Sequence, residues 1–155
     1  MTYRVAFDLD GTLFNHNGRV NWEDPGSVAH GTSPEGSRCW LVTDLHNCKW
    51  RIDFVTNRSE TLRNVTQMQL HAAFYWFKPS MLHMRDPLLG WEEGFQHKVG
   101  TLRMLGTGVY VGDQESDCDA ARVAGWGFLQ ADQFPRSIDL LPLLHPMAQP
   151  LTGVI

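Results

Sequence analysis

The sequence predicts an α/β fold in which a parallel sheet lies between two layers of helices. Three apolar segments with strand-like composition, residues 3–7, 51–55 and 108–111, each break abruptly into polar residues, and segments with helical spacing separate them. Strands that alternate with helices along a chain are typical of parallel α/β sheets. The 155 residues, 43% of them hydrophobic, suffice for a single domain over residues 1–155.

The first third of the chain predicts a strand, a flap and a helix. Residues 3–7 are β-branched and aromatic and end in the polar run DLDGT, so they predict a buried strand that opens into a loop. Residues 15–36 are polar and interrupted by glycine and proline, which predicts a loop or small flap beside the site. Ser33 and Pro34 have the form of an N-cap and a first-turn proline for the next helix.

The middle of the chain predicts a strand followed directly by a helix. The strand at residues 51–55 runs into polar residues, and Ser59 then has the form of an N-cap. Leu62, Val65 and Met68 follow at a spacing of three, which predicts the buried face of this helix.

The last third of the chain repeats the alternation. After the strand at residues 108–111, the run DCDAARVAG predicts a short helix that Gly125 closes, and residues 127–130 predict a further strand. Residues 134–155 form a proline-rich tail whose role the pattern does not indicate.

Composition narrows the classes of partner and compartment. The net charge of -4 gives no general attraction to a polyanion, which disfavours extended nucleic-acid binding. Cationic side chains in the middle of the chain still leave an anionic substrate open. The three cysteines form no CxxC pair, which suits a reducing compartment. Because no stretch has a signal core or approaches the roughly 20 apolar residues of a membrane span, we expect a cytoplasmic location and no membrane partner.

Four aspartates follow two of the predicted strands and favour a divalent metal. Asp8 and Asp10 follow the first strand, and Asp113 and Asp117 follow the strand at residues 108–111. The carboxyl ends of parallel strands meet at one edge of a sheet, so these side chains are expected in one pocket. Neighbouring carboxylates repel one another unless a cation or a shared proton lies between them, and Mg²⁺ binds carboxylate and phosphate oxygens.

An acidic pocket that holds a phosphate also needs hydrogen-bond donors and positive charge. Thr56 and Asn57 follow the second strand and can donate to phosphoryl oxygens. The ammonium group of Lys98 can offset the charge of the carboxylates, and Gly11 allows a close approach of the backbone.

Four segments resemble, in order, the four motifs of the haloacid dehalogenase (HAD) superfamily. DLDGT at residues 8–12 resembles the first motif, VTNR at residues 55–58 the second, Lys98 the third-motif lysine, and GDQESD at residues 112–117 the acidic fourth. The resemblance implies a Rossmann-like, HAD-like fold, Mg²⁺ as cofactor and the activity of a phosphatase, a phosphoric monoester hydrolase.

The resemblance also implies roles for individual residues. Asp8 would be the nucleophile that forms an aspartyl-phosphate, and Asp10 would protonate the leaving group and then activate water. The metal would be bound by Asp8, the backbone carbonyl of Asp10 and Asp113, with Asp117 either ligating it or supporting Lys98. Thr56 and Lys98 would assist catalysis. The remaining matched positions would bind substrate: Gly11, Thr12, Asn57 and Arg58.

Members of this superfamily usually recognise substrate with an inserted cap, and neither of the usual insertion points has room for one here. We therefore expect a capless member, or one with only the small flap at residues 15–36. An open site of this kind favours large substrates or a homo-oligomer whose neighbouring subunit closes the cleft.

Finer details resemble the 3′-phosphatase domain of phage-type polynucleotide kinases. The segment NGR at residues 17–19 follows the first motif, and Met84 and Arg85 precede Lys98 as in that subfamily. Arg85 would then contact the substrate phosphate. Residues 87–91 depart from the charged pattern of the subfamily, and the chain has no P-loop. The resemblance implies a nucleotide or a 3′-phosphorylated nucleic-acid end as substrate.

Several alternatives remain open at the level of sequence. The chain could be a non-catalytic HAD scaffold that binds a partner, a phosphatase of a non-nucleotide metabolite, or a phosphotransferase. The histidines show no paired metal-ligand spacing, so zinc is not expected, and His16 in the flap is the one that merits a test. Six aromatic residues could stack on a base if they border the cleft: Trp22, Phe74, Tyr75, Trp76, Phe77 and Trp91.

Overall fold

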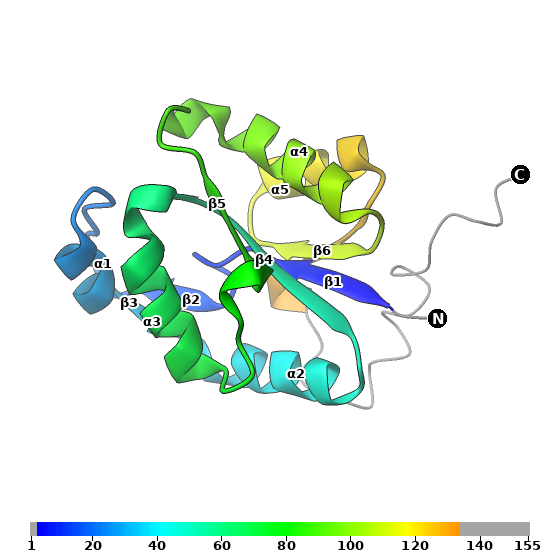
Figure 1. The fold of residues 1–155 in the computed structure, drawn as a ribbon, viewed down its shortest axis with the longest axis horizontal. Helices are drawn as coiled ribbons and strands as arrows, with labels where there is room; N and C mark the ends of the chain where they lie inside the picture. The colour runs from blue at the N-terminus through cyan, green and yellow to red at the C-terminus, as the bar shows by residue number, and fades with distance from the viewer. Residues whose placement is uncertain (1–2, 134–155) are drawn as a thin grey trace, which may run out of the picture.

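A five-stranded parallel sheet with the order β5-β4-β1-β6-β7 forms the centre of the molecule (Figure 1). The computed structural model describes residues 3–133, and the predicted tail at residues 134–155 lies outside them. The sheet confirms the predicted three-layer, Rossmann-like α/β fold. Its strands are β1 (Arg4–Phe7), β4 (Arg51–Ser59), β5 (Leu82–Arg85), β6 (Val109–Gly112) and β7 (Gly127–Gln130).

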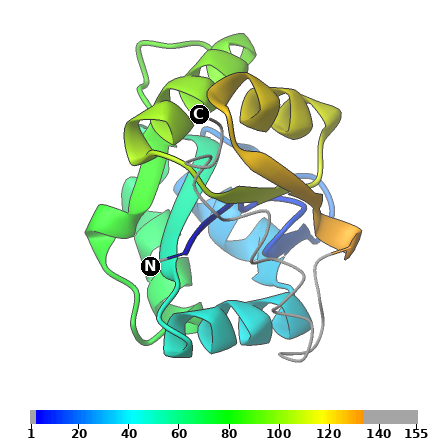
Figure 2. The same ribbon diagram turned by 90° about the vertical axis from the view of Figure 1, so that its right-hand side faces the viewer.

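Helices cover both faces of the sheet (Figures 1 and 2). Two helices pack against each other on one face, and two others cover the opposite face with a short helix beside them. The first face carries α4 (Gly94–Leu105) and α5 (Glu115–Ala124), and the second carries α2 (Gly36–Asn47), α3 (Arg63–Ala73) and the short α1 (Pro25–Gly31). Short 3₁₀ turns lie at η1 (Glu60–Leu62), η2 (Pro79–Met81), η3 (Trp91–Glu93) and η4 (Ala131–Gln133).

Each face of the sheet has its own hydrophobic core, because successive side chains of a strand point to opposite faces. In β1, Val5 and Phe7 contribute to the core under α2 and α3, whereas Ala6 contributes to the core under α4 and α5. Leu70 of α3 belongs to the first core, and Leu102 of α4 belongs to the second. The sheet is therefore buried on both faces, as parallel sheets usually are.

The predicted flap at residues 15–36 is more ordered than a loop. It contains β2 (Phe14–His16), α1 and β3 (Thr32–Pro34), and the two strands pair antiparallel with His16 opposite Thr32. Asp24 caps α1 by accepting a hydrogen bond from the backbone of Gly26. The flap is thus a small hairpin-like layer with one helix, and no larger cap lies among the described residues.

Two predicted helix starts need correction. Ser33 and Pro34 lie in strand β3, because pairing with β2 keeps them extended, and helix α2 begins at Gly36. Its N-cap is Glu35, whose side chain accepts a hydrogen bond from the backbone of Arg38. Ser59 does act as a cap, but of the turn η1 that precedes α3.

The predicted end of the last helix is confirmed. Gly125 adopts a left-handed conformation with φ of 79°, in which its amide donates to the last carbonyls of α5. No helix in the described part of the chain combines the length and the apolar character needed to cross a bilayer.

Candidate active site

Most of the predicted site residues meet at the carboxyl edge of the sheet, where β1 lies between β4 and β6. The chain passes from β1 to β4 on one side and returns to β6 on the other, so this edge is a topological switch point, the usual place for ligands in open α/β sheets. A cavity of about 500 Å³ opens there. Its lining contains Asp8, Asp10, His16, Trp22, Thr56, Asn57, Arg58, Trp91, Glu92, Gly94, Phe95, Lys98, Asp113, Gln114, Ser116 and Asp117.

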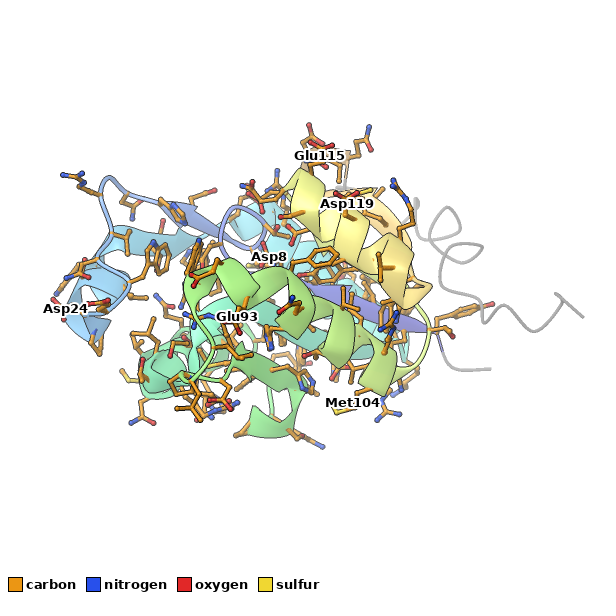
Figure 3. All side chains as sticks on the ribbon, turned by 90° about the horizontal axis from the view of Figure 1, so that it is seen from above. Asp8, Asp24, Glu93, Met104, Glu115 and Asp119 are labelled. Carbon is orange, nitrogen blue, oxygen red and sulfur yellow. The ribbon has the colours of Figure 1, made fainter. Side chains whose placement is uncertain are left out.

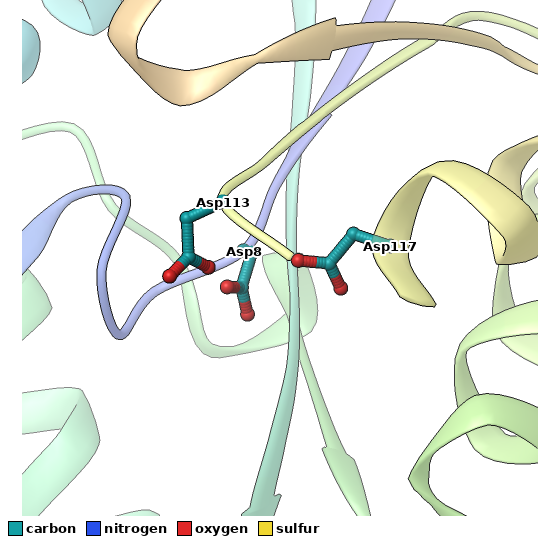
Figure 4. Close-up of side chains that lie close together, drawn as sticks. All are labelled: Asp8, Asp113 and Asp117. Carbon is teal, nitrogen blue, oxygen red and sulfur yellow. The ribbon is translucent and has the colours of Figure 1, made fainter. Parts of the chain in front are cut away.

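Three carboxylates converge at the base of this cavity (Figure 4). One oxygen from each of Asp8, Asp113 and Asp117 lies within 4.8 Å of the other two. Asp8 follows β1 and Asp113 follows β6, two paired neighbours in the sheet, while Asp117 is in the first turn of α5. The two sequence segments that carry these aspartates are therefore brought together by the sheet.

The acidic cluster fits a hard divalent cation. Asp113 Oδ1 is buried and has no hydrogen-bond partner among the described residues, so one carboxylate oxygen faces the cluster uncompensated. An unpaired buried carboxylate oxygen is costly unless a cation binds it. The all-oxygen donor set of Asp8, Asp113 and Asp117 is the type that Mg²⁺ and Ca²⁺ prefer.

Lys98 of α4 balances part of this negative charge. Its Nζ lies 3.2 Å from Asp8 Oδ1 and 2.5 Å from Asp117 Oδ1, and the side chain is buried. Burial alone would lower the pKa of Lys98, but the charges of Asp8 and Asp117 outweigh it and hold its pKa well above the ordinary value. The ammonium group therefore stays charged between the two carboxylates.

The environment of Asp8 shifts the pKa of its carboxyl group. Burial raises its pKa well above the ordinary value, Lys98 opposes the shift, and the neighbouring aspartates add to it. A carboxylate in this position is poorly solvated, and it is held ionised only by positive charge close by. The ammonium of Lys98 supplies such a charge, and a cation in the acidic cluster would supply more.

Asp117 uses both carboxylate oxygens within the fold. Oδ1 accepts from Lys98, and Oδ2 accepts from the backbone amide of Gln114 at 3.1 Å. The second bond completes a capping box at the start of α5. These bonds fix Lys98 relative to Asp8, which is the supporting role that the sequence left open for Asp117.

Asp10 has a different environment from Asp8, although only one residue separates them. Its side chain is 20% exposed, and Arg58 binds it with a two-pronged ion pair, Nε to Oδ2 at 2.9 Å and Nη2 to Oδ1 at 2.7 Å. Arg58 Nη1 donates to Thr66 and Gln69 of α3. The Arg58 guanidinium, expected to bind substrate, is thus engaged in orienting Asp10.

Thr56 and Asn57 lie at the same edge, at the end of β4. Thr56 lines the cavity, and its hydroxyl accepts a hydrogen bond from the backbone of Arg58 at 3.1 Å. Asn57 Nδ2 donates to the carbonyl of Trp91 at 3.2 Å. A Cβ atom at Gly94 would lie 2.4 Å from the Asn57 amide, so glycine is required there for α4 to approach β4 closely.

Three expected substrate-binding residues lie outside the cavity lining. Gly11 has φ of 80°, and a Cβ atom there would lie 2.0 Å from Asp113 Oδ2, so Gly11 makes room for that carboxylate. Thr12 is buried beneath the loop. Arg85 donates to the backbone carbonyls of Asn57 and Leu89, which braces the end of β4.

The cavity also contains residues that sequence reasoning did not assign. His16 of β2 places Nε2 3.8 Å from Asp10 Oδ1. Its place in the flap marks this histidine for a test, but the sequence pattern assigns it no role. Phe95, Glu92 and Ser116 carry no sequence signal, since single polar or aromatic residues at helix starts are common. Of the six aromatic candidates, only Trp22 and Trp91 line the cavity.

No protein-family model and no curated protein sequence matches the chain. Among solved structures, a chain of the Pnkp1/Rnl/Hen1 RNA repair complex aligns with a TM-score of 0.68 and 18% identity, over 83% of this chain and 42% of that one. A chain of a second Pnkp1/Rnl/Hen1 complex aligns with a TM-score of 0.61 and 19% identity, over 84% of this chain and 45% of that one.

A third structure, hypothetical protein PH1952 from Pyrococcus horikoshii OT3, aligns with 17% identity and a TM-score of only 0.39, over 86% of this chain and 42% of its own. The chain thus spans less than half the length of the structures it resembles. At this level of identity the first two alignments show a shared α/β fold. Fold and site together define an α/β protein with a buried aspartate cluster suited to a metal ion.

Proposed function

We propose that this chain is a Mg²⁺-dependent phosphatase of the HAD type that hydrolyses phosphate monoesters. The observation that carries the proposal is the contrast between two carboxylates at one cavity. Asp8 is buried and paired with Lys98 beside the acidic cluster, whereas Asp10 is partly exposed and held by Arg58. Carboxylates in different environments are suited to different roles, here nucleophile and proton carrier.

The proposed reaction has two steps with balanced bonds. An oxygen of Asp8 attacks phosphorus, the ester P–O bond breaks, and Asp10 gives its proton to the departing alkoxide. Asp10 then takes a proton from a water molecule, whose oxygen attacks the phosphorus of the aspartyl-phosphate and releases inorganic phosphate and free Asp8. The two-pronged ion pair from Arg58 orients the ionised Asp10 that takes the proton from water. For the first step Asp10 must be protonated, which releases one of its two contacts with Arg58.

Residues at the base of the cavity would hold Mg²⁺ and the phosphoryl group. Asp8, Asp113 and the backbone carbonyl of Asp10 are the proposed metal ligands, with Asp117 ligating or supporting. A bound cation would neutralise the charge of the phosphoryl oxygens. Thr56 and Lys98 would contact those oxygens directly, and Asn57 and Arg85 would keep the end of β4 in position.

The proposed substrate is a nucleotide or a 3′-phosphorylated nucleic-acid end. The resemblance of residues 17–19 and 84–85 to phage-type 3′-phosphatases supports this choice, as does the shared fold with chains of an RNA repair complex. The flap leaves the cavity open enough for the end of a larger molecule. A phosphatase of a non-nucleotide metabolite and a non-catalytic binding module are the alternatives, and the intact Asp8 argues against the second.

The test is phosphate release from a panel of 3′- and 5′-mononucleotides, 3′-phosphorylated oligonucleotides and sugar phosphates, with Mg²⁺ or EDTA. We expect Mg²⁺-dependent release that Asp8→Asn abolishes, because the substitution is nearly isosteric and replaces the attacking carboxylate with an amide. Asp119→Asn is the matched control, since Asp119 is half exposed on α5 and lies away from Asp8 (Figure 3). Release by Asp8→Asn at the wild-type rate would contradict the proposal, and no release from any substrate would favour the binding module.

A further inference from the structure

The cavity is much larger than a phosphoryl group, and its outer part is aromatic. The cavity has a volume of about 500 Å³, whereas one water molecule in the liquid takes up roughly 30 Å³. A cavity of this volume is in the range of pockets that hold small organic ligands. The acidic cluster and Lys98 occupy the base. Two tryptophans and a phenylalanine from two separate segments form most of the remaining apolar wall: Trp22, Trp91 and Phe95.

The aromatic residues of this wall are distinct from the aromatic core of the fold. Phe74, Trp76 and Phe77 are buried and stack on or tilt against Phe54 beneath the sheet. Trp91, in contrast, is 61% exposed although it lines the cavity. An indole ring left in water at the mouth of a pocket gains free energy when a flat apolar ligand covers it.

Trp22 lies where the leaving group of the proposed reaction would depart. The Arg58 guanidinium carbon lies 5.5 Å from the centroid of its ring, and the His16 ring meets it edge-on at 5.2 Å. Arg58 in turn binds Asp10, the proposed proton donor to the leaving oxygen. An organic group attached to that oxygen would therefore lie within reach of the Trp22 indole.

Trp91 is held at the cavity by the backbone of its own turn. Its carbonyl accepts from Asn57 Nδ2, and the missing side chain of Gly94 lets the start of α4 pack against Asn57. The N-terminal end of α4 and the flap with α1 lie at the same edge of the sheet (Figure 1). The indole is thus anchored through its backbone while its ring stays accessible.

Within residues 3–133, the cavity lining offers no unpaired arginine or lysine to a second phosphate group. Among the described residues of the lining, the cationic side chains are Arg58 and Lys98, and both are paired with carboxylates. Glu92 adds a negative charge near Trp91. Stacking on a base needs no further cation, because every base presents a π-face to an aromatic ring.

We propose that Trp91, together with Trp22, forms a subsite that stacks on the nucleobase next to the scissile phosphate. The inference rests on the proposed phosphatase activity and specifies its substrate class. The enzyme would select a single terminal nucleotide or mononucleotide by its base, and it would accept ribose phosphates without a base less well.

The experiment compares Trp91→Leu and Trp91→Phe with wild type on adenosine 3′- and 5′-monophosphate and on ribose 5-phosphate. We expect Trp91→Leu to lower kcat/KM for the preferred nucleotide about 10-fold, to leave ribose 5-phosphate unchanged, and Trp91→Phe to restore most of the loss. Trp40→Leu is the control, since Trp40 is 75% exposed on α2 and lies outside the cavity lining. Equal losses on both kinds of substrate would overturn the subsite and leave the phosphatase standing.

Calorimetric binding of the same nucleotides to Asp8→Asn, with and without Trp91→Leu, separates the two proposals. If Trp91→Leu weakens nucleotide binding to Asp8→Asn about 10-fold while the wild type hydrolyses none of the panel, the subsite is supported and the phosphatase is overturned. Binding that Trp91→Leu leaves unchanged would overturn the subsite whatever the activity.

Discussion

Asp8 and Asp10 lie two positions apart in one loop, yet their side chains have different environments. Asp8 is enclosed by the acidic cluster and Lys98, while Asp10 faces Arg58 and the flap. Their partners come from α4, α5 and β4, which are remote in sequence, and from the nearby β2. The proposed division of labour is therefore a product of tertiary packing around a short loop.

Asp113→Asn tests the proposed metal site without relying on turnover. In wild type, Mg²⁺ is expected to raise the melting temperature, because a ligand that binds only the folded state stabilises it by about 2.7 kcal/mol at 100 times its Kd. Asp113→Asn replaces the carboxylate that has an unpaired buried oxygen, so the shift should disappear. Calorimetric melting curves with Mg²⁺ or EDTA measure this, and Asp119→Asn should keep the full shift. A wild-type Mg²⁺ response in Asp113→Asn would place the metal elsewhere.

The sequence predicted which aspartates lie at the site, but it did not predict all the hydrogen-bond partners of Arg58. DLDGT and GDQESD have distinctive patterns, and the aspartates in them do line one cavity. Arg58 was expected at the substrate, yet Thr66 and Gln69 also bind it. An arginine has five donors, and which acceptors surround it depends on a helix that packs nearby.

Helix α4 links the base of the cavity to the end of β4. Lys98 reaches the aspartates, and the preceding residue, His97, places Nε2 2.9 Å from the carbonyl of Thr56. The imidazole thus holds the strand end that carries the proposed phosphate-binding hydroxyl. Two adjacent residues of α4 thus position both the ammonium group beside Asp8 and the end of β4 that carries Thr56.

His97→Gln should reduce the pH dependence of stability. Burial lowers the pKa of His97, so below its unfolded pKa of about 6.5 the unfolded chain binds a proton that the folded chain refuses. The neutral imidazole therefore contributes fully to the free energy of unfolding above about pH 6.5. This contribution is lost as the pH falls from there to the lower pKa of the folded state. Urea unfolding at pH 7.5 and pH 5.5 should show a smaller loss in His97→Gln than in wild type. Parallel losses would mean that His97 does not contribute to the pH dependence.

At the scale of elements, strands were easier to predict than helix faces. The strand at residues 127–130 was placed correctly, because its pattern is local. Met68 was assigned to a buried face with Leu62 but is 71% exposed. Six residues turn a helix by about 600°, which places Met68 roughly 120° from Leu62, and a spacing of three cannot hold one face for two turns.

The two cores lie on opposite faces of the sheet, and both include side chains of its strands. Each holds fully buried side chains, such as Leu70 under α3 and Leu102 under α4. The molecule should nevertheless unfold as one unit, since both cores need the same sheet.

Leu70→Ala and Leu102→Ala test this arrangement. Each should lower the free energy of unfolding by about 2–5 kcal/mol through lost burial and a cavity. Because the two side chains belong to separate cores, the losses in the double variant should add within about 0.5 kcal/mol. Chemical denaturation followed by fluorescence and by circular dichroism gives both values. Two separate transitions, or a strong deviation from additivity, would mean that the cores are not joined as described.

β1 lies in the middle of the sheet, so it can pair fully only after strands that are synthesised later have emerged from the ribosome. Within this sheet β1 is synthesised before its neighbour β4, but Val5 pairs on its other side with Val109 of the later strand β6. Until β6 has been synthesised, the N–H and C=O groups along one edge of β1 have no partner strand, and Asp113 has not yet emerged beside Asp8. The nascent chain must therefore protect an exposed strand edge until β6 emerges, a state in which aggregation competes with folding.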